Sequence, residues 1–240
     1  MRERKNSPQK RNIRRVIMVV ILTVLCITVY RTSIISIKQS NLFSKKVLLQ
    51  KNNKSDSFID WNILLVNKDH PVPDDYEIDF TELSNGERID SRIYPELQSM
   101  FDDARARGMH LFVREGYRTM KEQQQVMNEK VKKYMEDGHS KQEAKRLAEE
   151  YVAIPGTSEH QLGLSVDINA DTSKTPSSEV YAWLAENSYK YGFVKRYPSD
   201  KVDITGINDE PWHYRYVGKK VAKEMKEKNL CLEEYLEQLE

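Results

Sequence analysis

The sequence has little cysteine, no excess of one charge and no repetition. Its two cysteines are Cys26, inside an apolar run, and Cys231, near the C-terminus, so they are not placed to bridge within one domain. The formal net charge of +1 lacks the basic excess typical of nucleic-acid-binding proteins, and we expect no nucleic-acid partner. No internal repeat or heptad run appears, which argues against solenoids and coiled coils.

One long hydrophobic run lies near the N-terminus. Residues 16–30 are apolar and follow fifteen residues that contain seven basic side chains and a single acid, Glu3. At about 1.5 Å per residue this run covers roughly 22 Å, less than a hydrocarbon core of about 30 Å, but the apolar character continues to Ile37. A cleavable signal peptide has the same basic and apolar order. Because no Ala-x-Ala site follows, we predict an uncleaved transmembrane signal-anchor over residues 16–37.

The positive-inside rule then orients the chain in the cell membrane. It predicts a basic cytoplasmic tail over residues 1–15 and places the rest of this single-pass chain outside the cytoplasm. Residues 38–57 are polar and lack persistent periodicity, as expected of a stalk. We expect residues 58–240 to form the main domain, because about 180 residues can bury a substantial core without a disulfide.

Two short segments of that domain hold side chains that bind metals. Residues 158–167 contain His160 and Asp167, and residues 210–213 contain Glu210 and His213. Two imidazoles and one carboxylate are typical ligands of a catalytic zinc ion, which keeps a further position open for water, while a spare glutamate moves protons. We predict one Zn²⁺ per domain, held by His160, Asp167 and His213, with Glu210 as the base.

The local pattern is compatible with that geometry. Asp167 is flanked by apolar residues in alternation, which predicts a strand with Asp167 on its open face; these residues are Leu164, Val166 and Ile168. A turn at Gly163 lets His160 fold back over the start of the strand. His213 begins a second alternating run, and Pro211 keeps the chain between Glu210 and His213 extended or turned.

These segments resemble the D-Ala-D-Ala carboxypeptidases of the vancomycin-resistance VanY type. The family pattern is Ser-x-His-x-x-Gly-x-Ala/Ser-x-Asp, followed by Glu-x-Trp-His. Further matches lie at residues 64–68, 115–123, 191–193 and 196–198, so the resemblance covers roughly residues 58–240. The departures are mild: Glu115 and Thr119 replace serines, and Ser165 stands where alanine is commoner.

The resemblance implies roles for residues around the metal. Arg118 corresponds to an arginine that stabilises the transition state, and Gln123 and Ser158 to groups that hold the substrate. Tyr117, with Arg118 and Ser158, is a candidate donor to the terminal carboxylate of the substrate. The plainer alternatives are a surface salt bridge for Arg118 and a loop cap for Ser158, while only one of three consecutive glutamines can face a cleft. We expect structural or surface roles for the remaining histidines, which are His70, His110 and His139.

The apolar periodicity predicts an α+β fold with a small antiparallel sheet and flanking helices. Helices are expected over residues 94–107, 178–190 and 219–228, near 232–239, and as one or two solvated helices broken near Gly138 within residues 121–151. A short strand is expected at residues 111–113, and a connection or hairpin arm at 200–206. The resemblance implies the hedgehog and D,D-peptidase type of this fold.

The resemblance also implies an activity. It indicates a membrane-anchored zinc metallocarboxypeptidase that removes the C-terminal D-Ala from peptidoglycan precursor stem peptides ending in D-Ala-D-Ala, which would reduce the target of glycopeptide antibiotics. The alternatives are an L,D-carboxypeptidase acting on tetrapeptides, a dipeptidase, and a non-catalytic cell-wall binding module. Glu210 and Arg118 argue against the last, because binding alone requires neither.

Overall fold

The computed structural model describes residues 61–239. The tail, signal-anchor and stalk predicted for residues 1–57 lie outside this range and remain predictions. Within residues 61–239, no helix combines the length and the apolar character needed to cross a bilayer.

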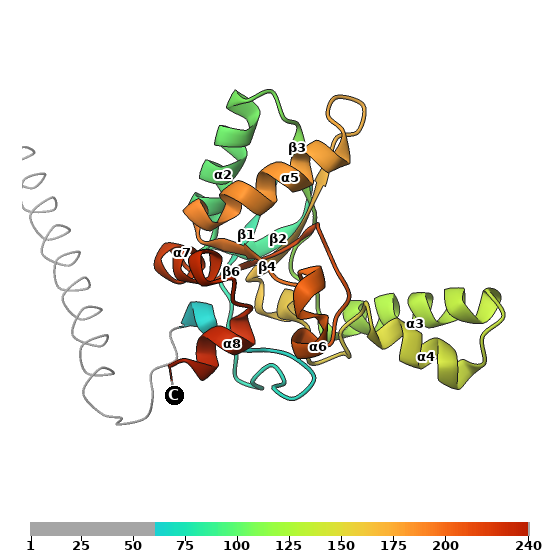
Figure 1. Ribbon diagram of the computed structural model, residues 1–240. Coiled ribbons are helices and arrows are strands. Elements are labelled where there is room, and N and C mark those ends of the chain that lie inside the picture. Colours follow the sequence, from blue (N-terminus) through green and yellow to red (C-terminus); the bar gives the residue numbers. More distant parts are fainter. Residues whose placement is uncertain (1–60, 240) are drawn as a thin grey trace, which may run out of the picture. The chain divides into compact units, whose positions relative to one another are not determined.

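Two antiparallel sheets organise the described chain (Figure 1). A hairpin pairs β1 (Phe80–Glu82) with β2 (Arg88–Asp90), and a four-stranded sheet has the order β3 (Leu111–Glu115), β4 (Ser165–Ala170), β6 (His213–Tyr216), β5 (Phe193–Lys195). The α-helices are α2 (Tyr94–Ala106), α3 (Met120–Glu136), α4 (Lys141–Glu149), α5 (Ser177–Asn187), α6 (Val202–Thr205), α7 (Lys219–Lys228) and α8 (Leu232–Glu237). Single 3₁₀ turns are η1 (Trp61–Ile63), η2 (Glu159–Leu162), η3 (Ser188–Tyr191) and η4 (Ser199–Lys201). The predicted α+β class is confirmed, with sheet strands drawn from distant segments.

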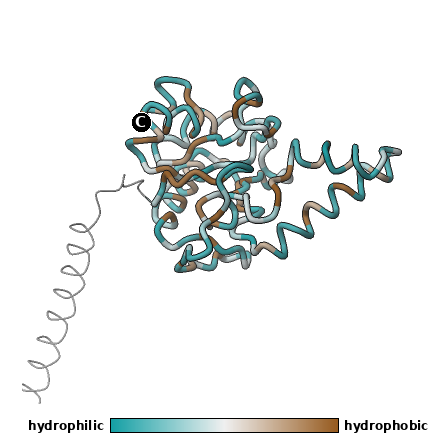
Figure 2. The backbone as a smooth tube through the Cα atoms, turned by 90° about the horizontal axis from the view of Figure 1, so that it is seen from below, coloured by the Kyte–Doolittle hydropathy of each residue, from teal (hydrophilic) through white to brown (hydrophobic). Residues whose placement is uncertain are grey.

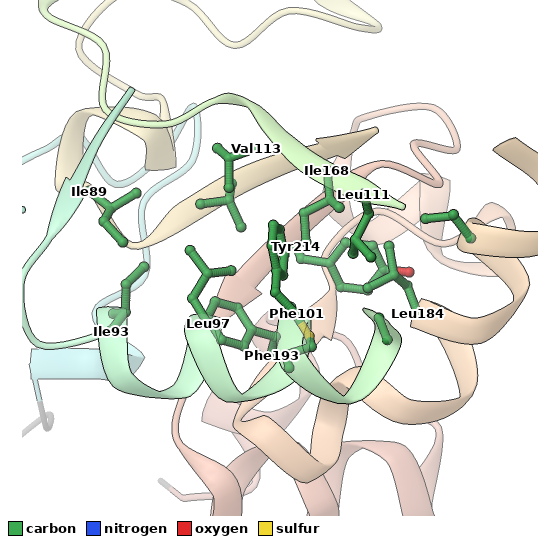
Figure 3. Close-up of a cluster of buried hydrophobic side chains, with 14 of the residues drawn as sticks. Ile89, Ile93, Leu97, Phe101, Leu111, Val113, Ile168, Leu184, Phe193 and Tyr214 are labelled. Atoms are coloured by element: carbon green, nitrogen blue, oxygen red, sulfur yellow. The ribbon is translucent and has the colours of Figure 1, made fainter. Parts of the chain in front are cut away.

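The main core lies between one face of the four-stranded sheet and the helices α2 and α5 (Figure 3). Helix α2 contributes Leu97 and Phe101, and α5 contributes Val180 and Leu184. The sheet contributes alternate residues of each strand, among them Leu111, Val113, Val166, Ile168, Phe193 and Tyr214. The alternation read from the sequence therefore identified the apolar face of β4 correctly.

The opposite face of the sheet carries polar side chains that are also buried. Ser165, Asp167, His213 and Arg215 all lie on it with little or no exposure. A second apolar cluster formed with α7 and α8 covers part of this region; it comprises Ile63, Val194, Val217, Ala222, Met225, Leu232 and Tyr235. Asp167 lies on the face opposite the apolar core, as expected, but this face is largely covered: the Asp167 side chain is only 11% exposed and lines the cleft described below.

Helices α3 and α4 form a hairpin that projects from the rest of the described chain (Figures 1 and 2). Thr119 and Glu122 form a capping box at the start of α3, and Ser140 caps α4. The predicted break near Gly138 is confirmed. Gln123, in the first turn of α3, is buried, and further residues of α3 line the cleft described below, so this helix forms one wall of it.

Other predictions differ from the structure at short elements. Residues 199–205 form η4 and α6 rather than an arm of a hairpin, since Pro198 precedes the first turn and Gly206 ends the second in a left-handed conformation. Helix α5 ends at Asn187 and continues as η3, three residues before the predicted end. The three-residue strands β1, β2 and β5 were not predicted, because so short a segment carries almost no periodicity.

Candidate metal centre and active site

His160, Asp167 and His213 converge on one point. One ligand atom from each lies within 4.8 Å of the others. His160 Nε2 is 3.4 Å and His213 Nδ1 is 3.0 Å from Asp167 Oδ1, and the two imidazole rings stand nearly perpendicular with centroids 4.9 Å apart. Two nitrogens and one oxygen in this arrangement can hold one zinc ion and leave a position open.

The backbone brings these three residues together for simple reasons. Asp167 and His213 are direct partners across β4 and β6, so their side chains leave the same face of the sheet. His160 lies in η2, which ends at Gly163 in a left-handed conformation (φ 66°) that returns the chain into β4. An added Cβ at Gly163 would also lie 3.0 Å from the backbone nitrogen of Asp90. The turn expected at Gly163 is therefore present and requires glycine.

An outer hydrogen bond orients the ring of His160. Its Nδ1 lies 2.7 Å from the carbonyl oxygen of Gly116, which fixes the proton on Nδ1 and leaves Nε2 free to bind a metal. Gly116 has no room for a side chain, since a Cβ there would clash with the carbonyl oxygen of Arg88. The loop after β3 thus approaches its neighbours closely enough to reach His160.

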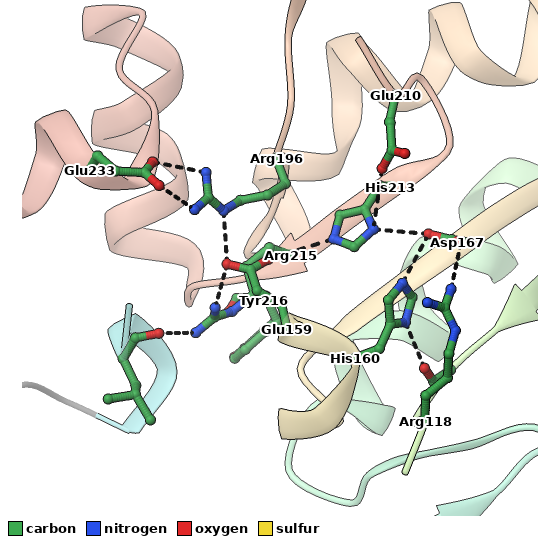
Figure 4. A network of polar contacts seen from close by, with 12 residues as sticks. Arg118, Glu159, His160, Asp167, Arg196, Glu210, His213, Arg215, Tyr216 and Glu233 are labelled. Carbon is green, nitrogen blue, oxygen red and sulfur yellow. Dashed lines mark hydrogen bonds and ion pairs between the residues drawn. The ribbon is translucent and has the colours of Figure 1, made fainter. Parts of the chain in front are cut away.

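His213 meets carboxylates on both sides of its ring (Figure 4). Nδ1 faces Asp167 and lies 3.9 Å from Glu210 Oε2, while Nε2 faces Glu159 Oε2 at 3.6 Å. The carboxylates of Asp167 and Glu159 outweigh the effect of burial, which alone would lower the pKa of His213, and raise that pKa to about 9. The pKa of Asp167 is shifted in the opposite direction. Burial would raise it, but the two histidines hold it well below its usual range.

Glu210 lies at the edge of this cluster, in the loop before β6. Its backbone N–H donates to the carbonyl of Tyr197, and its own carbonyl accepts from the N–H of His213, which holds the loop against the sheet. Burial raises the pKa of its carboxyl group to about 7, despite the opposing charge of His213. A carboxylate with a pKa near neutrality beside a metal site is suited to accept a proton.

Arg118 is fixed on the other side of Asp167. Its guanidinium donates to Gln123 Oε1 at 2.9 Å and to Glu115 Oε2 at 3.2 Å, and it reaches Asp167 Oδ2 at 3.4 Å. Gln123 in turn donates through Nε2 to the carbonyl of Ala153 at 2.7 Å. Of the three consecutive glutamines only Gln123 is buried, and both ends of its amide already have partners. Its contacts are those of a residue that positions Arg118.

The cluster opens into a cleft of about 580 Å³. Arg118, Gln123, Ser158 and Glu210 line it together with the three ligand candidates. Tyr117 is not among its lining residues: its ring packs against Phe80, and the guanidinium of Arg88 lies 5.2 Å from its centroid. The remaining histidines are exposed and stand apart from the cluster; they are His70, His110 and His139.

A family model for VanY D-alanyl-D-alanine carboxypeptidases matches residues 86–219, a span that contains His160, Asp167, His213, Glu210 and Arg118. The chain belongs to the VanY family. A D-alanyl-D-alanine carboxypeptidase of Enterococcus faecalis is 55% identical over 177 residues, which cover 74% of this chain and 66% of that relative. The match therefore spans about two thirds of the relative's length, and the family resemblance expected from the sequence is confirmed.

Solved VanY structures have the same fold. One is the vancomycin-resistance D,D-pentapeptidase VanY of a VanB-type resistance cassette in complex with Zn(II), at 55% identity and a TM-score of 0.73, over 74% of this chain and 99% of that one. Another is VanYB in complex with D-alanine-D-alanine, at 54% identity and a TM-score of 0.73, over 74% and 98% of the two chains. The nitrogen and oxygen donors of His160, Asp167 and His213 fit the same metal, and the predicted zinc cofactor is confirmed.

The site of this VanY chain contains residues that sequence reasoning did not single out. Glu159 is fully buried beside His213, and it binds Arg196 Nε and Arg215 Nη1 at 2.8 Å each. Arg196 also forms a paired contact with Glu233 of α8, at 2.7 and 2.9 Å. The available signals were weak: Glu159 precedes a ligand histidine, and Arg196 lies in a segment already matched to the family.

Proposed function

We propose that this chain is a zinc carboxypeptidase that removes the C-terminal D-Ala from peptidoglycan precursor stem peptides ending in D-Ala-D-Ala. The observation that supports this most directly is the convergence of His160, Asp167 and His213 beside Glu210, in a chain of the VanY family. A VanY relative with the same fold is known in complex with D-alanine-D-alanine.

In this proposal His160 binds zinc through Nε2, Asp167 through its carboxylate and His213 through Nδ1. Each of these atoms faces the common point, and the other nitrogen of each imidazole faces an acceptor outside the cluster. Bound zinc supplies Lewis acidity, which lowers the pKa of the attacking water and polarises the scissile carbonyl. The protein residues supply the remaining steps.

Glu210 accepts the proton of the attacking water and passes it to the departing amine. Its carboxylate lies within 4 Å of His213 Nδ1, and burial raises its pKa to about 7, so it changes protonation state readily near neutral pH. Asp167 cannot replace it, because its oxygens face both imidazoles and Arg118. Arg118 faces the developing negative charge of the carbonyl oxygen, held in place by Gln123 and Glu115.

The cleft also suits an anionic peptide. Arg114, Lys130 and Lys133 line it in addition to Arg118, and within residues 61–239 none of these three makes an ion pair with an acidic side chain. The terminal carboxylate of the substrate and acidic groups elsewhere in a stem peptide are matched by this charge. Ser158, two residues before His160 in the sequence, also lines the cleft and offers a hydroxyl to the substrate.

Incubation of the purified full chain with zinc and a muramyl pentapeptide ending in D-Ala-D-Ala tests the proposal. Mass spectrometry identifies the products, beside a Glu210→Ala control. Loss of one alanine, abolished by the substitution, supports the D,D-carboxypeptidase and its base. Release of D-Ala from the tetrapeptide but not from the pentapeptide would move the assignment to the L,D class, and no cleavage of either would favour a wall-binding module.

We further propose that the chain is anchored in the cell membrane by residues 16–37, with its catalytic domain outside and a role in glycopeptide resistance. The support is the order of basic tail, apolar run and polar stalk in the sequence. Protease treatment of intact protoplasts tests the topology: the catalytic domain should be degraded while the tail is protected. The opposite pattern would contradict the proposed orientation.

A further inference from the structure

The buried side of His213 contains two polar atoms that face each other without a partner. His213 Nε2 and Glu159 Oε2 are 3.6 Å apart, and both are fully buried atoms without a hydrogen bond to any residue from 61 to 239. An unpaired buried polar group is costly, and two complementary ones at this distance need only a few tenths of an ångström to pair. The separation is therefore suited to a hydrogen bond that forms when Nε2 carries a proton.

Glu159 cannot turn away from His213. Its Oε1 accepts from both Arg196 and Arg215 at 2.8 Å, and its side chain has no exposure (Figure 4). Arg215 is itself held by the carbonyls of Leu64 and Asn62. Arg196 is held by Glu233. The two arginines thus fix one oxygen of Glu159 and direct the other at the imidazole.

The position of the proton on His213 decides whether the residue can bind a metal. A neutral imidazole has one donor nitrogen and one acceptor nitrogen. Binding through Nδ1 requires the proton on Nε2, which is the nitrogen that faces Glu159. His160 has a comparable arrangement on its opposite nitrogen, with the carbonyl of Gly116 as acceptor, so the two imidazoles differ in having a neutral and a charged outer partner.

We infer that Glu159 is a positioning residue that accepts the Nε2 proton of His213 and so directs the Nδ1 lone pair at the zinc. This rests on the proposed role of His213 as a ligand. The simpler alternative is that Glu159 only neutralises two buried arginines. That role would affect folding stability but would leave metal binding unchanged, and the two can be separated because Glu233 shares Arg196 with Glu159 without touching His213.

Zinc affinity of Glu159→Gln and of the matched control Glu233→Gln tests the inference. Both variants remove a carboxylate charge from the same buried network, but of the two glutamates only Glu159 faces His213. With the full chain and a competing chelator, we expect the zinc dissociation constant to rise about 10- to 100-fold for Glu159→Gln, the usual effect of losing an outer partner of a metal-binding histidine, and to change less than about twofold for Glu233→Gln. Equal affinities in both variants would overturn the inference.

The absorption spectrum of the Co²⁺-substituted chain gives a second readout, which should change in Glu159→Gln and not in the control. A His213→Ala variant separates this inference from the proposed ligand set. If His213→Ala weakens zinc binding while Glu159→Gln does not, the ligand assignment stands and the role of Glu159 is wrong. If His213→Ala binds zinc normally, the ligand assignment itself is wrong, and with it the inference.

NMR of the unsubstituted chain avoids any dependence on how well Glu159→Gln folds. With the five histidines labelled with ¹⁵N, zinc-loaded protein should show His213 with a proton on Nε2, slow to exchange and shifted downfield by a carboxylate acceptor. A His213 proton on Nδ1, or an Nε2 proton in rapid exchange with water, would contradict the inference.

Discussion

Glu210 and Glu159 approach the same imidazole from opposite sides, and their surroundings change their acidity in opposite directions. Both are buried, and burial alone raises the pKa of a carboxyl group. For Glu210 burial prevails and the pKa rises to about 7, whereas for Glu159 the charges of Arg196 and Arg215 outweigh burial and hold the pKa well below its usual range. One glutamate can exchange protons near neutral pH, and the other stays an anion.

This difference in acidity distinguishes two sides of His213: the cleft side, where Glu210 lies, and the network side, where Glu159 binds Arg196 and Arg215. Glu210 lines the cleft, and no arginine within residues 61–239 forms an ion pair with it, while Glu159 is enclosed by a network that joins η1, β6 and α8. Two arginines and two glutamates in the network balance in charge. Residues on the cleft side should therefore govern turnover, and residues on the network side should govern the stability and precision of the metal site.

The largest effect on turnover is expected from Glu210→Gln. Loss of the proton-accepting group should lower kcat by about 10²- to 10⁴-fold, the usual contribution of general acid–base catalysis, with zinc content unchanged. Fixed-time assays of D-Ala release measure kcat, and metal analysis measures the zinc content. Asp209→Asn, at the exposed neighbouring position that pairs with Lys195, should behave as the unsubstituted enzyme. A loss of zinc in Glu210→Gln would mean that Glu210 belongs to the ligand set.

Arg118→Lys should have the next largest effect. Lysine keeps the charge but cannot reproduce the contacts of the guanidinium with Gln123, Glu115 and Asp167, so we expect kcat and kcat/KM to fall together by about 10²-fold. Equal losses in the two constants would indicate a contact made only in the transition state. Arg105→Lys, at an exposed position of α2 outside the cleft, serves as control. A rise in KM alone would instead assign Arg118 to ground-state binding of the substrate.

Gln123→Leu should reduce turnover to a smaller extent. The substitution removes one acceptor of Arg118 and the bond to Ala153, and a single hydrogen bond of about 1 kcal/mol corresponds to roughly a fivefold lower kcat. Gln124→Leu, the next residue of α3 and exposed, should leave kcat unchanged. A change confined to KM would return Gln123 to the substrate-binding role that the family resemblance implied.

Sequence reasoning identified the fold wherever periodicity was strong. The spacing of Leu97, Phe101 and Ala104 predicted α2, and the alternation through Val166 and Ile168 predicted β4. Three-residue strands offer no such signal, which is why β1, β2 and β5 were missed. The burial of the polar face of β4 was also missed, because it depends on the packing of η1, α7 and α8, segments distant in sequence.

The candidate site divides in the same way. His160, Asp167, His213 and Glu210 could be predicted because they lie in two short segments with a recognisable chemical inventory. Glu159 and its arginines could not, since a charged residue is usually solvent-exposed and nothing local shows that these are buried. The resemblance also implied substrate contact for Tyr117. Its ring lies against Phe80 and does not line the cleft, so the structure gives this role no support and it stays a prediction.

Glu233→Gln should affect turnover least, and it tests whether charge on the network side contributes to stability. Burial would raise the pKa of Glu233, but Arg196 outweighs it and lowers that pKa below the unfolded value of 4.5. A lowered pKa in the folded state gives stability that is fully present above pH 4.5 and is lost as pH falls through the folded value. Glutamine keeps the shape without the charge, so it should lower the free energy of unfolding by about 2 kcal/mol at pH 7.

Denaturant unfolding at pH 7 and pH 3, with chelator present at both so that metal release does not contribute, measures the difference. The gap between Glu233→Gln and the unsubstituted chain should narrow at pH 3, because part of the native stabilisation has then been lost, while kcat at pH 7 stays within about twofold. An equal gap at both pH values would mean that glutamine disturbs packing rather than charge. A large fall in kcat would show that the two sides of His213 are not independent, because the network would then set the geometry of the cleft as well as its stability.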